Sequence, residues 1–140
     1  MTMELFSGYQ WLTGVLTGDA LLTSYAPGGV WRALAPNTTA PPFVIMSFQN
    51  GSDITNMNEF RLFVEATYQV KVVGPASATP NLVLAASRID TLLGLANGTV
   101  SNGNILACWR VSPLAVDSLV NGELWSDIGG LYRLQIENTN

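Results

Sequence analysis

The 140-residue chain is rich in hydrophobic residues (48%), poor in charged ones (11%) and carries a net charge of −4. It has no His and a single Cys, which excludes imidazole catalysis, an internal disulfide and CxxC metal sites. Its six basic residues form no stripe that could bind a nucleic-acid backbone, and no apolar run is long enough to cross a membrane. This length and hydrophobicity fit one domain with one core, which we expect to span residues 1–140.

The first 42 residues predict a helix and then a loop. Apolar side chains recur every three or four positions over residues 3–17, although Gly8 and Gly14 weaken that helix. The predicted buried face consists of Leu5, Phe6, Tyr9, Leu12 and Leu16. Residues 26–42 are rich in Pro, Gly, Asn and Thr, and we expect a short edge strand there around Val30 to Leu34.

Two strands follow. Residues 43–48 are β-branched and aromatic, and Asn50-Gly51-Ser52-Asp53 then indicates a turn or a long polar loop to Asn58. Residues 61–72 alternate between apolar and polar side chains, as in a half-buried strand. The side chains on its predicted core face are Leu62, Val64, Ala66, Tyr68, Val70 and Val72.

The second half predicts a helix and more strands. Thr79-Pro80 is a helix start, and the helical spacing continues to Asn97-Gly98. A strand over residues 105–111 is expected to stop at Pro113, with residues 116–120 continuing the sheet. Asn121-Gly122 is a two-residue hairpin signal, and residues 131–136 form the last strand. The predicted fold is α+β, a mostly antiparallel sheet with two helices on one face.

Little in the sequence points to catalysis. Two carboxylate pairs, Asp53 with Glu59 and Asp117 with Glu123, lie in turn-rich segments. The single Lys, Lys71, lies on the polar side of a strand, so a Schiff-base role has no support. Nucleotide-binding glycine motifs are absent, and we expect no enzyme activity, cofactor or metal. Cys108 lies in an apolar stretch and is expected to fill the core.

The low charge indicates self-association. A small monomer usually has about 25–35% charged residues on its surface, which this chain cannot supply. Charge-depleted, aromatic surface is typical of interface cores, so we expect stable assembly. Trp11, Tyr68 and Trp109 are expected in the core rather than at contacts.

Six short features follow one another along the chain in a characteristic order. They are a helix at residues 3–16, a strand after Pro41-Pro42, a long strand at residues 60–73, a helix ending in Leu92-Leu93-Gly94, a strand with Trp109-Arg110 and a last strand with Tyr132-Arg133-Leu134. Over nearly the whole chain, this order resembles the tail terminator proteins of long-tailed bacteriophages, also called tail completion or minor tail proteins.

The resemblance implies a structural virion protein at the tail–neck junction, assembled in the host cytoplasm. Such a protein forms a homohexameric ring that caps the tail tube, ends its polymerisation and joins the tail to the head–neck connector or stopper protein. DNA only passes through the lumen, and no membrane is involved. Alternatives are a tail tube or head–tail connector subunit, or a small non-viral α+β ligand-binding module. The residues expected at subunit and tube contacts are Asn50, Asp53, Asn56, Asn58, Asn121, Gly122, Leu124 and Trp125.

Overall fold

The computed structural model describes residues 2–58 and 61–138. Strands dominate it, so the predicted α+β class is correct, with three α-helices where two were expected. None of the helices in these residues is long and apolar enough to cross a membrane. The elements in chain order are α1 (Thr2–Thr17), α2 (Ala20–Tyr25), β1 (Val30–Arg32), β2 (Phe43–Thr55), β3 (Arg61–Pro75), a 3-10 turn (Ala76–Ala78), α3 (Thr79–Leu93), β4 (Gly98–Val100), β5 (Gly103–Val120) and β6 (Glu123–Asn138).

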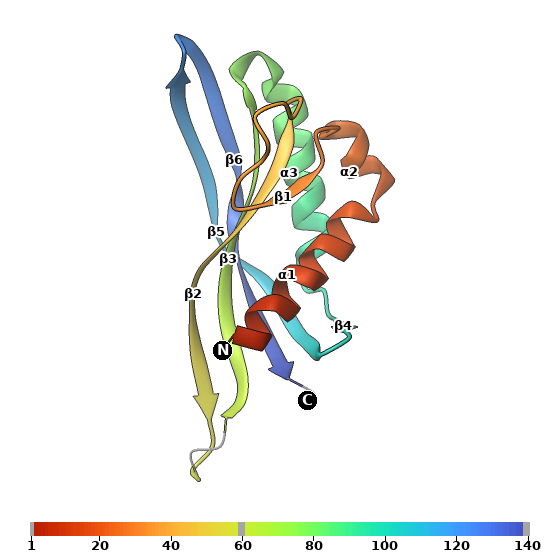
Figure 1. Ribbon diagram of the computed structural model, residues 1–140, viewed down its shortest axis with the longest axis vertical. Coiled ribbons are helices and arrows are strands. Elements are labelled where there is room, and N and C mark those ends of the chain that lie inside the picture. Colours follow the sequence, from red (N-terminus) through yellow and green to blue (C-terminus); the bar gives the residue numbers. More distant parts are fainter. Residues whose placement is uncertain (1, 59–60, 139–140) are drawn as a thin grey trace.

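The strands form one six-stranded sheet in the order β1-β2-β3-β6-β5-β4. Every neighbouring pair is antiparallel except β1 with β2, which is parallel. The sheet is long and twisted, with the β2–β3 hairpin at one end and the β5–β6 hairpin at the other (Figure 1). The β2–β3 hairpin extends past the helices, whereas the β5–β6 hairpin ends near the start of α3.

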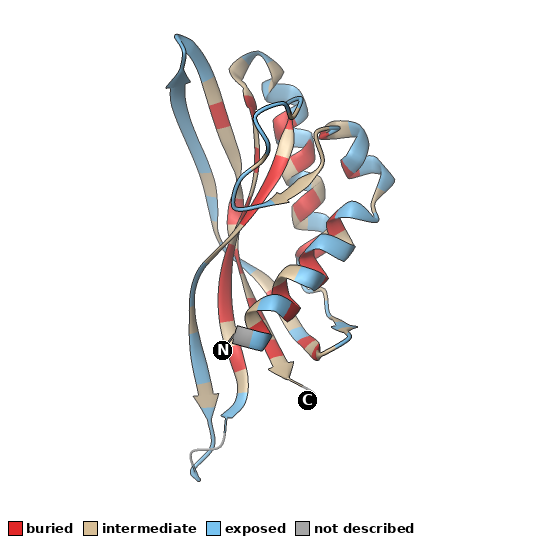
Figure 2. Ribbon diagram, in the orientation of Figure 1, coloured by how far each residue is buried: buried red, intermediate tan, exposed pale blue. Residues whose placement is uncertain are grey.

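The core lies between the sheet and the helices (Figure 2). The alternation predicted for residues 61–72 is confirmed from Val64 to Val72, whereas Leu62 is half exposed near the strand end. Cys108 is buried as expected, and so are Trp11 and Tyr68, but Trp109 is only partly buried. The largest fully buried side chains are Tyr68, Tyr132, Leu12, Leu16, Leu22, Met46, Leu82, Ile89, Leu93, Ile105, Leu134 and Ile136.

Helix α1 packs against Tyr68 through a small residue. Gly8 lies directly on the Tyr68 ring, because a Cβ at this position would be 2.6 Å from Tyr68 Cζ. The Tyr68 hydroxyl donates a 2.9 Å hydrogen bond to the Leu5 carbonyl in the same helix. Phe6, predicted on the buried face, is exposed instead, because the close approach at Gly8 turns the face with Phe6 away from the sheet.

Two strands are longer than their sequences predict. β2 continues through the expected turn to Thr55, with a register shift between Phe48 and Asn50. β5 continues through Pro113, which was expected to stop it. Proline lacks an N–H group and is tolerated on an edge strand. β4 pairs with β5 only at Gly103–Ile105, so β5 is the outer strand at Pro113.

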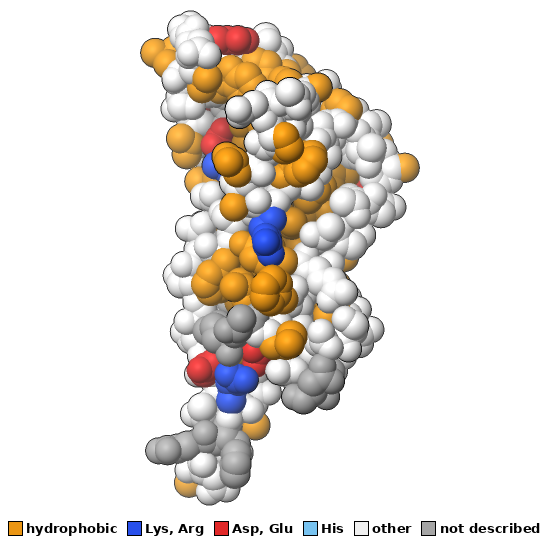
Figure 3. Space-filling view, viewed as in Figure 1, with side chains coloured by type: hydrophobic (Ala, Val, Ile, Leu, Met, Phe, Trp, Pro, Cys, Tyr) orange, Lys and Arg blue, Asp and Glu red, His pale blue; other side chains and the backbone are white. Residues whose placement is uncertain are grey.

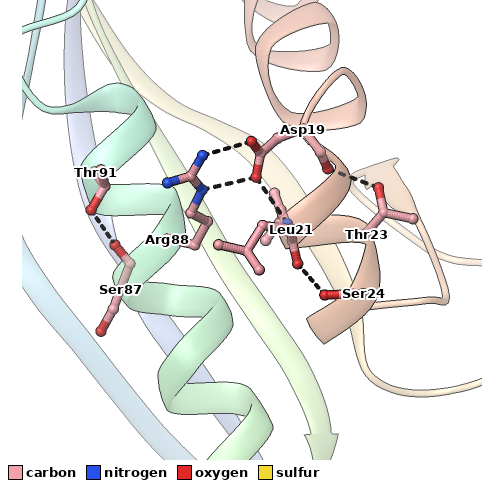
Figure 4. Close-up of polar contacts among 8 residues, drawn as sticks. Asp19, Leu21, Thr23, Ser24, Ser87, Arg88 and Thr91 are labelled. Atoms are coloured by element: carbon pink, nitrogen blue, oxygen red, sulfur yellow. Dashed lines mark hydrogen bonds and ion pairs between the residues drawn. The ribbon is translucent and has the colours of Figure 1, made fainter.

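The short helix α2 is tied to α3 by a charged pair. The Asp19 carboxylate caps α2 by accepting a hydrogen bond from the Leu22 N–H, and it also accepts 2.9 and 2.8 Å bonds from the Arg88 guanidinium (Figure 4). The Arg88 hydrogen bond and the Leu22 N–H together lower the pKa of Asp19 to about 2. One side chain therefore both starts α2 and positions it against α3.

Candidate functional site

The two hairpins at opposite ends of the sheet are the most distinctive surfaces of the molecule. We call residues 112–128 the β5–β6 arm, and residues 49–58 with 61–63 the β2–β3 arm. β3 ends at Pro75 opposite Trp125, so the tip of the β5–β6 arm has no third strand beside it. At the other end, Arg61 to Phe63 pair only with β2.

The β5–β6 arm is apolar although it is exposed. Leu119 has 75% of its surface exposed, and Val116, Val120 and Leu124 are about half exposed. Hydrophobic side chains are visible at that end of the molecule in Figure 3. The charged residues of the arm are all acidic: Asp117, Glu123 and Asp127. A long apolar edge strand tends to associate with another chain, so this arm is suited to an interface.

The predicted hairpin turn at the tip of this arm is confirmed. Val120 pairs with Glu123, which leaves Asn121 and Gly122 as a two-residue loop. Both residues have positive φ angles, 52° and 79°, as a type I′ turn requires. Trp125 lies further along the arm and is partly buried.

The β2–β3 arm is more polar. Asn50 and Asp53 are exposed on β2, and Asp53 lies 3.9 Å from the Arg61 guanidinium. Asn56 and Asn58 are in the turn, where the Asn58 N–H donates a hydrogen bond to Asn56 Oδ1. The eight predicted interface residues therefore fall into two groups at opposite ends of the sheet, and they do not form one site.

Both outer borders of the sheet are covered over only part of their length. On the border formed by β2, strand β1 pairs with Val44 to Met46. The Met46 carbonyl also accepts a hydrogen bond from the Ala33 N–H, and the Phe48 N–H donates one to the Tyr9 hydroxyl. On the border formed by β5, strand β4 pairs with Gly103 to Ile105, and the Cys108 carbonyl accepts a hydrogen bond from the Leu95 N–H. In the part of the chain that the structure describes, no backbone partner is seen beyond these points, along residues 49–55 of β2 and residues 110–120 of β5.

A cationic platform lies where β1 ends, and sequence reasoning missed it. The exposed Arg32 guanidinium lies 5.2 Å from the centre of the Tyr9 ring and 5.8 Å from that of Phe6. Among the described residues, no carboxylate forms an ion pair with it. Only the fold brings Arg32 and α1 together, so no local motif could have revealed this contact.

Several charged groups on the sheet and on α3 are paired with one another. A groove of about 570 Å³ between α3 and the β5–β6 sheet contains Asp90 and Arg110, which lie 3.8 Å apart. Tyr132 donates a hydrogen bond to the same Asp90 carboxylate. Lys71, the single lysine, forms a 2.8 Å ion pair with Asp127.

The expected carboxylate pairs give no catalytic geometry either. Asp117 accepts a hydrogen bond from Ser126 on the exposed arm, and Glu59, the expected partner of Asp53, lies outside the described residues. Burial and the nearby Asp90 raise the pKa of Cys108 to about 12, so its thiol is protonated at neutral pH. Within the described ranges, no cluster of three or more potential metal-ligating side chains occurs.

Comparison with known proteins identifies a fold but no sequence family. No protein-family model matches the chain, and no curated protein matches it by sequence. A solved structure described as the virion of a native gene transfer agent particle is similar in fold, with a TM-score of 0.73 and 19% identity over 94% of this chain and 92% of that one. A second solved chain overlaps more loosely, with a TM-score of 0.47 and 14% identity over 76% of this chain and 78% of the other. The first of these likenesses, at 19% identity, shows that this chain shares its fold with a component of a virion particle.

Proposed function

We propose that this protein is a structural component of a phage-like virion that assembles into a ring at the end of a tail tube. In this role it is a tail terminator: it stops tube polymerisation and joins the tail to the head–neck connector. Its partners are copies of itself, the tail tube protein and a neck protein. The role is structural and requires no catalysis, and DNA passes through the lumen.

The observation that carries this proposal is the exposed apolar surface of the β5–β6 arm on a fold shared with a virion component. A head-to-tail contact that closes by rotation gives a ring, and obligate contacts bury large apolar areas. The exposed apolar side chains of the arm are suited to such a contact, and the net charge of −4 disfavours retention of DNA that passes through the ring.

Light scattering after size exclusion tests the assembly. We expect a mass six times that of the 15.0 kDa chain, and single rings by electron microscopy. Long tubes would identify a tube subunit instead. A monomer at micromolar concentration would contradict the proposal.

A matched pair of variants tests the role of the arm. Leu124→Asp places a charge on the arm, at a side chain with 46% exposure, and Leu84→Asp does the same on α3, at 47% exposure. We expect Leu124→Asp, and likewise Trp125→Ala, to reduce the ring fraction while the circular dichroism spectrum stays unchanged. Leu84→Asp should leave the ring intact. Equal effects of the two Asp variants would mean that the arm has no special role in assembly.

A further inference from the structure

We infer that the ring contact proposed above, on which this inference rests, is made by adding the free edge of β5 of one copy to the free edge of β2 of the next. The occupant of each border is thus a second copy of this chain. The contact is a strand addition, in which backbone hydrogen bonds supply affinity without a demanding side-chain match.

The directions of the strands suit this contact. β2 is antiparallel to β3, β3 to β6 and β6 to β5, so β2 and β5 run in opposite directions on opposite borders of one sheet. When two copies lie side by side in the same orientation, β5 of one therefore meets β2 of the other as an antiparallel pair. The sheet then continues from copy to copy with its usual antiparallel pattern.

The free edges also determine how neighbouring copies are offset. Phe48, Tyr68, Tyr132 and Arg110 are successive cross-strand partners and form one row across the sheet. The free part of β2 lies on one side of this row and the free part of β5 on the other. Two copies at equal height would bring neither free edge against the other, so one copy must be displaced along the strands. Pairing residues 49–55 fully requires a displacement of about seven residues, or roughly 24 Å at 3.4 Å per residue.

Charge complementarity supports this offset. Arg32 is level with Met46, where the cover provided by β1 ends and the free edge of β2 is about to begin. In the displaced arrangement, the tip of the neighbouring β5–β6 arm, with Glu123 beside its turn, comes to Arg32. The platform of Arg32 on two aromatic rings thus gains an acidic partner. Pro113 cannot donate to the new ladder, but all the residues from Leu114 to Val120 carry an N–H group.

Cross-linking between differently labelled copies tests the contact, because the buried Cys108 does not compete with a surface thiol. Ser52 on β2 and Ala115 on β5 are both exposed, and the displacement of seven residues makes them direct cross-strand partners. Copies with Ser52→Cys are mixed with copies of different size that carry Ala115→Cys, and a short bismaleimide is added. We expect a cross-linked heterodimer, and none when Ser24→Cys on α2 replaces Ser52→Cys.

The outcomes separate this inference from the proposed function. If Ala115→Cys cross-links only to itself, or if a ring-sized assembly gives no cross-link, the edge pairing is wrong while the ring remains. A monomeric mass overturns both. As a second measurement, Arg32→Glu should lower the cross-link yield several-fold, and Glu123→Arg in the same chain should restore it. Failure of this charge exchange to restore the yield would refute the offset.

Discussion

The contact between Gly8 and Tyr68 offers a sharp test of how α1 is docked. Replacing Gly8 by Ala places a Cβ against the Tyr68 hydroxyl, 2.6 Å from Cζ and 2.9 Å from Cε2. The Tyr68 ring is fully buried and makes edge-to-face contacts with Tyr9 and Phe48, at centroid distances of 5.1 and 5.7 Å. It cannot move aside without losing these contacts and its hydrogen bond to Leu5.

The size of the effect follows from three contributions. Overpacking costs about 1–3 kcal/mol, and disturbing a buried hydrogen bond costs about 1–3 kcal/mol more. The better helix propensity of Ala offsets about 1 kcal/mol of this. We therefore expect Gly8→Ala to lower the free energy of unfolding by about 1–5 kcal/mol.

Gly14 in the same helix is the matched control. A Cβ there meets nothing within 4 Å, so Gly14→Ala should stabilise the protein by about 0.8–1 kcal/mol. The two variants should then differ in melting temperature by roughly 8–24 °C, at about 4 °C per kcal/mol. Thermal unfolding followed by circular dichroism at one fixed protein concentration measures this difference, because self-association makes melting temperature depend on concentration.

A double variant checks the cause. Tyr68→Phe removes the hydroxyl that the new Cβ meets first, so in the Gly8→Ala background it should cost less than it does in the unmodified protein. If Gly8→Ala is as stable as Gly14→Ala, α1 does not pack on Tyr68 in the way described.

Three further outcomes are expected. Arg88 holds the pKa of Asp19 at about 2, below the value near 4 that Asp19 has in the unfolded chain. The ionised carboxylate therefore stabilises the fold above about pH 4, and this stabilisation is lost as the pH falls toward 2. Asp19→Asn should lower the melting temperature at pH 7 and make stability depend less on pH in acid. The Cys108 thiol should not react with a thiol reagent at pH 8 until guanidinium unfolds the chain, and fast reaction of the native protein would place it at the surface. Gly129→Ala should destabilise by more than about 3 kcal/mol in chemical denaturation, because its Cβ would lie 2.6 Å from the Lys71 Cα in a neighbouring backbone that cannot yield; near-native stability would show that β3 and β6 are further apart.

Local sequence patterns predicted the parts of the fold where one strong constraint acts. Strand β3 must bury one side, and its period-two alternation records that requirement. Pro80 in the first turn of α3 and Asn121-Gly122 at the hairpin tip meet backbone needs that few other residues satisfy. In each case the evidence lies within a few neighbouring residues.

The arms were predicted less well, because pairing rather than burial determines their structure. Asn50 to Asp53 have turn-forming side chains, yet they continue β2 because the opposite strand provides a ladder. Pro113 fits within β5 only because that border is open, which is a property of the sheet and not of the residue. Sequence reasoning therefore placed its expected contact residues near the two tips, but it did not reveal the uncovered edges or the position of Arg32.

The uncovered edges lie on opposite sides of the row through Tyr68, and this affects whether the assembled copies can close into a ring. Every successive copy would be shifted in the same sense, so the shifts add up around the assembly. The last copy returns to the height of the first only if the strands incline to the axis by the amount that absorbs the sum, as they do in closed barrels. Without that inclination the same contacts would produce an open spiral, so the twist of this sheet decides between a finite cap and an endless filament.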